Sequence, residues 1–350
     1  TGTYYGLTQP LKDLPVITEE EFRMQALETY VPNEDEKKEK SYPFAETALP
    51  QGPEPVWQDS PGNLKSAAGA LQLNFAGISS PYSVSDCNGA VGPDHYMLTI
   101  NSAYAIYDKE GNIQAGPTNM NLLFGSVPGA NCNDGDPIIL YDEVAERWLA
   151  AEFSLCGSTD RMLIAVSTTS DPTGTWHQYS FDVADMPDYE KFGIWRDAYY
   201  MGTNTSGGTD IYAFERDQML EGGTAQMIAF DNPWKPNVGG VTVPPLDNDG
   251  THAPDGSPGM FIAVNDDAWG GSSVDQVWIY EFVADWDDPS NSTFDRVQEI
   301  DVSAFDSNFG PTWDNIVQPG TSQKLHGLIG YVMNRPQYRN FGSYETIVLC

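Results

Sequence analysis

The chain has 350 residues, which is enough for one large domain or two ordinary ones. Its 50 acidic and 17 basic residues give a formal net charge of −33, so the chain would repel nucleic-acid phosphates and anionic membrane surfaces. An aromatic content of 12% excludes disorder over most of the chain, and no apolar run is long enough to span a membrane. The 33 Gly and 25 Pro residues favour a turn-rich β protein.

Residues 1–80 differ in pattern from the rest of the chain. Residues 18–30 predict one short amphipathic helix, with Thr18 and several acidic residues at its start. A charge-rich stretch and then a Pro-rich segment follow. We interpret residues 1–80 as an extended arm that lies over a domain formed by residues 81–350; a disordered arm is the alternative.

From about residue 82 onwards, short apolar runs recur in pairs that are separated by turns, which predicts antiparallel hairpins. In chain order, the pairs are 96–100 with 104–107, 137–141 with 147–153 (followed by 162–166), 198–201 with 211–214, 260–264 with 276–282, and 328–333 with 345–349.

The repeat between these units is longer than a single hairpin. Successive units are spaced by about 50 to 70 residues and contain several strands each, which predicts the blades of an all-β propeller. Five blades are visible, and six or seven are expected if the chain is a piece of a longer protein. A β-sandwich, with shorter and more even strand spacing, is the main alternative.

The four cysteines bear on the cellular compartment. Cys132 and Cys156 lie equally far from the centre of the turn between 137–141 and 147–153, so an antiparallel hairpin would bring them within reach of a disulfide. Cys87 and Cys350 either pair with each other or remain free. A disulfide, together with a chain that starts at Thr1 like a processed form, favours a secreted or cell-surface protein.

Several segments resemble known propeller families. Residues 136–142, followed by 147–149, resemble the blade opening of arabinanase-like and xylosidase-like glycoside hydrolases. Residues 165–176 are similar to the sequence segment that follows the blade opening in those enzymes, and they also resemble the Asp-box of sialidase-like propellers. Residues 187–200 and 335–342 resemble large secreted bacterial propeller proteins of unassigned function.

The hydrolase resemblance implies a set of catalytic carboxylates. The Asp of the blade opening acts as general base in those enzymes, and it matches Asp136 here. A second Asp is expected, for which Asp197 is our candidate. Glycoside hydrolysis also needs an acid, and Glu152 and Glu215 are candidates because they lie in or next to predicted strands.

Three oxygen-rich loops are candidates for binding calcium. Residues 247–250 begin like a calcium loop, with Asp247 and Asp249 at alternate positions, although the distal Glu of an EF-hand is missing. A second such loop contains Asp134 and Asp136, and Asp266 with Asp267 is a third candidate. Plain Asx turns are the alternative explanation for all three.

A polysaccharide lyase is a second enzymatic hypothesis. It would use a His and a Tyr to move a proton and Arg to neutralise a uronate. Its candidate residues are His252, His326, Arg335, Tyr338 and Arg339. Structural ion pairs with the many carboxylates are the competing explanation for the two arginines.

Aromatic side chains can bind sugars by offering flat apolar faces to pyranose rings. Our candidates are Trp195, Tyr199 and Trp269, although most Trp and Tyr residues are expected in the core.

Three functions remain open at this stage. The first is a secreted hydrolase or lyase that acts on an extracellular polysaccharide. The second is a non-catalytic, calcium-stabilised binding or adhesion propeller. The third is a surface protein that assembles with other copies through residues 1–80. A propeller can serve all three. The expected partner is therefore a glycan, with neither nucleic-acid binding nor membrane insertion.

Overall fold

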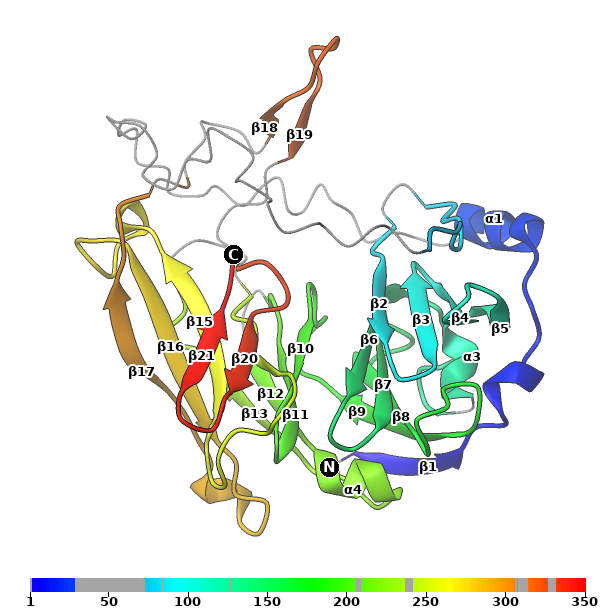
Figure 1. The fold of residues 1–350 in the computed structure, drawn as a ribbon, viewed down its shortest axis with the longest axis horizontal. Helices are drawn as coiled ribbons and strands as arrows, with labels where there is room; N and C mark the ends of the chain where they lie inside the picture. The colour runs from blue at the N-terminus through cyan, green and yellow to red at the C-terminus, as the bar shows by residue number, and fades with distance from the viewer. Residues whose placement is uncertain are drawn as a thin grey trace.

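The computed structural model describes residues 2–28, 73–82, 85–125, 127–205, 209–236, 242–305, 307, 314–326 and 332–350. This part of the chain is mainly β and forms several small, mostly antiparallel sheets (Figure 1). Its helices are short: α1 (Glu19–Glu28), α3 (Asn121–Phe124), α4 (Arg216–Glu221) and the 3₁₀ turns η1 (Leu11–Asp13), η2 (Asp267–Trp269) and η3 (Pro289–Asn291).

Three four-stranded antiparallel meanders follow one another along the chain. The first contains β2 (Asn88–Val91), β3 (His95–Ile100), β4 (Ala103–Asp108) and β5 (Ile113–Asn119). The second contains β6 (Gly135–Asp142), β7 (Arg147–Ser154), β8 (Arg161–Ser167) and β9 (Trp176–Asp182). The third contains β10 (Lys191–Ile194), β11 (Ala198–Gly202), β12 (Thr209–Glu215) and β13 (Met227–Asp231).

The fourth sheet contains β15 (Gly259–Asn265), β16 (Gln276–Val283) and β17 (Thr293–Asp301). Residues 244–246 pair along its β15 edge and lead into β14 (Asp247–Asn248). Strand β14 also pairs in parallel with β20 (Gln337–Asn340), which pairs with β21 (Glu345–Val348). A separate hairpin joins β18 (Asp314–Val317) and β19 (Lys324–His326).

The first strands of successive units lie next to one another. Strand β2 contacts β6, β6 contacts β10, and β10 contacts β14. Figure 1 shows the sheets arranged around these strands, from β2–β5 at one side of the molecule to β15–β17 at the other. We call β2, β6, β10 and β14 the inner strands.

Side-chain alternation explains how each sheet packs against two neighbours. Along β11, Ala198 and Tyr200 enter the core shared with the fourth sheet, whereas Tyr199 and Met201 enter the core shared with the second. A third core joins the first and second sheets around the fully buried Trp148. Both faces of the middle sheets are therefore buried, unlike those of a two-layer sandwich.

The all-β prediction and the first four predicted hairpins are confirmed. The last predicted pairing, of 328–333 with 345–349, is not tested, because residues 328–331 lie outside the described residues. Strand β21 pairs with β20, and the Met333 N–H donates to the Cys350 carbonyl at 3.0 Å. The sheets resemble propeller blades, while closure into a ring of five, six or seven blades stays a prediction.

The described part of the N-terminal arm lies on its own sheets. Strand β1 (Thr3–Leu7) adds to the outer edge of the second sheet by pairing with β9. Leu11 is buried in the core between the first and second sheets, and Phe22 of α1 packs near Ile100. Thr18 caps α1, because its hydroxyl accepts from the Glu21 N–H while the Glu21 carboxylate accepts from the Thr18 N–H.

Cys132 and Cys156 form a disulfide with their Cα atoms 6.0 Å apart, as the hairpin geometry predicts. Cys87 and Cys350 are exposed and unpaired among the described residues. None of the described helices is both long and apolar enough to cross a membrane.

Candidate active site at the entrance of the inner strands

The starts of the neighbouring inner strands β2, β6 and β10 share a backbone feature. Asp86, Asp136 and Tyr189 have φ angles of 38°, 52° and 55°, and each lies at the start of an inner strand or shortly before it. Such left-handed backbone is uncommon for residues with a Cβ, and it is concentrated at functional sites. We call this end of the inner strands the hub.

Asn101, in the turn between β3 and β4, ties two of these entrances together. Its amide nitrogen donates to a carboxylate oxygen of Asp86, and its amide oxygen accepts from the backbone N–H of Asp136 at 2.9 Å. The first sheet therefore fixes the backbone from which the Asp136 carboxylate projects.

Glu152 lies on β7, the strand next to β6, and is completely buried. Neither of its carboxylate oxygens has a hydrogen-bond partner at good geometry among the described residues. Burial, followed by the negative charge of Asp134 and then that of Asp136, raises the pKa of Glu152 well above its usual value, while the nearby backbone N–H of Gly135 opposes the shift. The environment of Glu152 therefore favours its protonated form.

Glu190 immediately precedes β10 and is also completely buried, without a hydrogen-bond partner for its carboxylate among the described residues. Its pKa is raised well above the usual value, first by burial and then by Asp136, while Lys191 opposes this shift. Asp136 thus acts electrostatically on two buried carboxyl groups, Glu152 from its own sheet and Glu190 from the next.

The group of Asp86, Asp134, Asp136, Glu152, Asp188, Glu190 and Lys191 is hereafter the hub cluster. It combines two carboxyl groups that favour the protonated form with a partly exposed aspartate at the entrance of an inner strand. Titratable groups whose environments push their pKa values apart are the usual basis of acid–base catalysis. The hub cluster therefore contains candidates for general-acid catalysis.

Two of the other predicted carboxylates lie at the opposite end of the sheets. Asp197 follows β10, both of its carboxylate oxygens accept from the Tyr200 hydroxyl at 3.1 Å, and burial raises its pKa. Glu215 ends β12 and accepts from the Gln226 N–H at 2.9 Å. The structure therefore does not bring Asp197 or Glu215 together with Asp136.

The residues of the lyase hypothesis are also away from the hub. Arg335 binds Asp247 at 2.6 Å, and Asp247 accepts from the N–H of Ile194 at the far end of β10. Arg339 binds Asp249 at 3.4 Å.

Tyr338 is buried and packs against Trp195 with ring centroids 4.9 Å apart. His252 lies in the loop after β14, and its pKa is lowered, mainly by burial. His326 ends β19, and its side chain lies outside the described residues.

The three aromatic residues predicted to bind sugar are in the interior. Trp195 and Tyr199 are completely buried, and Trp269 is 6% exposed. Trp195 and Trp269 pack in the core between the third and fourth sheets, and Tyr199 packs in the core between the second and third. Their rings stabilise sheet-to-sheet packing in this structure.

The predicted calcium ligands do not converge. Asp247 and Asp249 bind arginines, and burial raises the pKa of Asp247 to about 6. Asp134 accepts from the Leu155 N–H at 2.7 Å and belongs to the hub cluster. The third candidate loop differs, because carboxylate oxygens of Asp266, Asp267 and Asp275 lie within 4.8 Å of one another and could hold a metal ion.

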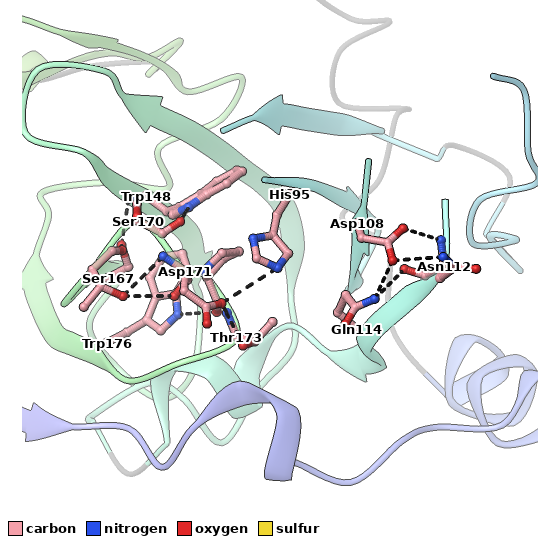
Figure 2. Close-up of polar contacts among 12 residues, drawn as sticks. His95, Asp108, Asn112, Gln114, Trp148, Ser167, Ser170, Asp171, Thr173 and Trp176 are labelled. Carbon is pink, nitrogen blue, oxygen red and sulfur yellow. Dashed lines mark hydrogen bonds and ion pairs between the residues drawn. The ribbon is translucent and has the colours of Figure 1, made fainter. Parts of the chain in front are cut away.

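The segment that resembles an Asp-box forms the turn between β8 and β9 (Figure 2). Asp171 accepts from the backbone N–H and the hydroxyl of Thr173, and its carboxylate lies 3.9 Å from His95 of the first sheet. The indole N–H of Trp176 donates to the Pro172 carbonyl at 2.9 Å. These contacts give the motif a structural role at the junction of two sheets.

Sequence reasoning missed Glu190 and Lys191. They lie just before and at the start of a four-residue strand that carries too little alternation to be recognised. Both residues lie within residues 187–200, the segment that resembles secreted bacterial propeller proteins. This resemblance was the sequence signal that pointed to the segment.

No protein-family model and no curated protein matches the chain. Among solved structures, it is similar to a candidate glycoside hydrolase from Parabacteroides distasonis (10% identity, TM-score 0.34, covering 75% of this chain and 82% of that chain).

A structure from work on GH130 mannoside phosphorylases and glycoside hydrolases that target β-1,2 mannosidic linkages in Candida mannan is similar too (10% identity, TM-score 0.33, 75% and 80% covered). So is an α-L-arabinofuranosidase from Lactobacillus brevis (12% identity, TM-score 0.24, 61% and 73% covered). At these scores the likeness is loose, and the function proposed below rests on the hub cluster.

Proposed function

We propose that this chain is a secreted, carbohydrate-active propeller protein that hydrolyses glycosidic bonds in an extracellular polysaccharide at the hub cluster. The observation that supports the proposal is the pair of completely buried carboxyl groups, Glu152 and Glu190, whose pKa values burial and the charge of Asp136 both raise. Glycoside hydrolysis needs two carboxyl groups, one protonated and one ionised.

The positions of the three residues suggest their roles. Asp136 begins an inner strand and is partly exposed, so it acts as general base or nucleophile. Glu190 precedes the neighbouring inner strand and donates the proton to the leaving group. Because Glu190 is covered in this structure, the covering residues must move aside when a glycan binds. Glu152 is farther from the inner strands and supports Asp136.

Electrostatics favours hydrolysis over the lyase reaction. Lyases need a cation to neutralise a uronate, but Arg335 and Arg339 bind Asp247 and Asp249 instead. The hub cluster contains six acidic residues and one lysine, so it repels anionic polymers. Neutral glycans are therefore the expected substrates.

A panel of neutral and acidic polysaccharides tests the proposal, with reducing ends and unsaturated products measured separately. We expect the wild-type protein to release reducing ends from a neutral polymer, and Asp136→Asn or Glu190→Gln to lower the rate by about 100-fold or more. Glu221→Gln, an exposed change at the end of α4, is the matched control and should retain the wild-type rate. Tight retention on one polymer without any product would contradict hydrolysis and support the binding function.

A further inference from the structure

Trp234, in the loop after β13, presents an aromatic ring to solvent. The residue is 47% exposed, whereas the other tryptophans in the described part of the chain are buried or half-buried. A ring that keeps about half of its surface in water offers a flat apolar face to a ligand. The aromatic residues that the sequence predicted to bind sugar lie in the core, so this role is open to an exposed ring such as that of Trp234.

The loop that carries Trp234 is held in place on both sides of the ring. The Asp210 carboxylate accepts from the backbone N–H of Asn232 and from the Lys235 ammonium group, both at 2.8 Å. The Asn232 side chain accepts from the Trp234 N–H at 3.0 Å, and the Tyr280 hydroxyl donates to the Trp234 carbonyl at 2.8 Å. A ring on a preorganised loop loses little freedom on binding, which favours affinity.

The charged groups beside this ring are already paired. The Arg296 guanidinium lies 5.9 Å from the centroid of the Trp234 ring and binds Glu299 at 2.8 Å. Lys235 binds the buried Asp210. Because both cations are neutralised, this surface has little attraction for an anionic polymer, while its polar groups can still exchange hydrogen bonds with hydroxyl groups. An apolar ring bordered by paired polar groups suits a neutral sugar, which has an apolar face and a rim of hydroxyl groups.

Trp234 lies at the same end of the third sheet as the hub cluster. Strand β13 ends at Asp231, which pairs with Thr209 at the start of β12. The same end of β12 pairs with Gly202 of β11, and Gly202 pairs with Lys191, the first residue of β10. The ring and the start of β10 are therefore separated by the width of the sheet, about 14 Å for three strand spacings. A polymer can reach both places, whereas a single sugar unit cannot.

We propose that Trp234 is a binding platform for a neutral polysaccharide, separate from the hub cluster. A sugar ring of the polymer stacks on the exposed face of the indole, and its hydroxyl groups contact the paired side chains of Arg296 and Glu299. The inference rests on the proposed function for the choice of a neutral glycan as ligand, but it requires no cleavage of that glycan.

The test is affinity electrophoresis of the full chain in native gels, each of which contains mannan, arabinan, galactan or β-glucan, with polygalacturonate as the anionic comparison. We expect at least one neutral polymer to retard the wild type. Trp234→Ala should weaken that binding by about 10-fold or more, the loss typical of removing an aromatic anchor. Trp234→Tyr keeps a flat ring and should retain most of the affinity.

Phe341 provides the matched control, because it is an aromatic residue that is 57% exposed at the turn between β20 and β21. Phe341→Ala should bind like the wild type. If Trp234→Ala does not fold, Trp234→Leu replaces it, because leucine keeps an apolar side chain without a flat ring. Equal retardation of the wild type and of the Ala or Leu variant would overturn the inference. So would retardation by polygalacturonate alone, or by none of the polymers.

Cleavage of the same polymers is measured separately, so the two proposals fail in different ways. Retardation that depends on Trp234 without any release of reducing ends would refute the proposed hydrolysis and leave this inference standing. Release of reducing ends with retardation that does not depend on Trp234 would do the opposite.

Discussion

The ion pair between Arg216 and Asp142 gives the sharpest stability prediction. Arg216, on α4 after the third sheet, binds Asp142, at the end of β6 in the second sheet, through two contacts of 2.6 and 3.1 Å. The side chains are 6% and 1% exposed, and the Tyr199 hydroxyl donates to the same carboxylate at 3.2 Å. Removing one partner leaves an uncompensated buried charge.

Arg216→Met is therefore expected to lower the free energy of unfolding by about 3–5 kcal/mol. The unfolding entropy scales at about 2.1 cal/mol/K per residue, so for a chain of 350 residues a loss of about 4 kcal/mol lowers Tm by about 5 °C. The assays are calorimetry and urea unfolding followed by tryptophan fluorescence.

Arg161→Met is the matched control. Arg161 binds Asp182 at 2.9 Å, but Asp182 is 69% exposed, so its loss should cost about 1 kcal/mol or less. Adding Asp142→Leu to Arg216→Met should restore much of the stability, because no unpaired charge then remains. Equal, small losses in Arg216→Met and Arg161→Met would refute the reasoning.

Three further predictions address other parts of the fold. Glu152→Gln should make stability less sensitive to alkaline pH. When folding raises the pKa of a carboxyl group, its contribution to stability is full below the unfolded-state pKa. The contribution is lost as the pH rises through the folded-state pKa, at about 1.4 kcal/mol per unit of pKa difference. Unfolding measured at acidic and at alkaline pH checks this prediction. Reducing the Cys132–Cys156 disulfide, which closes a loop with a sequence separation of 24, should cost about 3.5 kcal/mol in denaturant unfolding. Gly202→Ala would place a Cβ 2.1 Å from the Val243 carbonyl oxygen, so it should lower Tm by separating the third and fourth sheets, whereas Gly174→Ala, whose Cβ would lie 3.4 Å from the Asp171 carbonyl oxygen, should cost less.

The strands that were predicted correctly carry a strong signal of their own. Residues 147–153 form a long apolar strand, because both faces of the second sheet are buried, and residues 276–282 form the largely buried central strand of the fourth sheet. The inner strands β2 and β10 were missed because they have four residues each and contain glycine. A Cβ at Gly193 of β10 would lie 2.5 Å from the Leu246 carbonyl oxygen, so close packing of the inner strands required the residue that weakened the signal.

Part of the candidate site could be predicted from the sequence. Asp136 was found through its family resemblance, and Glu152 was recognised only as an acid within a strand. The burial of Glu152 and Glu190 depends on tertiary packing, and no local pattern distinguishes these two among 50 acidic residues. The three aromatic candidates were wrongly predicted to bind sugar, because a large aromatic ring suits a sugar-binding surface and a protein core equally well.

The central claim is that burial, together with the nearby Asp136, raises the pKa values of Glu152 and Glu190 well above their usual range. An NMR titration of the side-chain carboxyl carbons in the full chain, assigned with Glu152→Gln, Glu190→Gln and Asp136→Asn, measures this most directly. The account predicts that both glutamates titrate well above their usual range and that Asp136→Asn lowers both midpoints, because the Asp136 charge contributes to both shifts. Finding both glutamate midpoints at about 4, as in unfolded peptides, would contradict it.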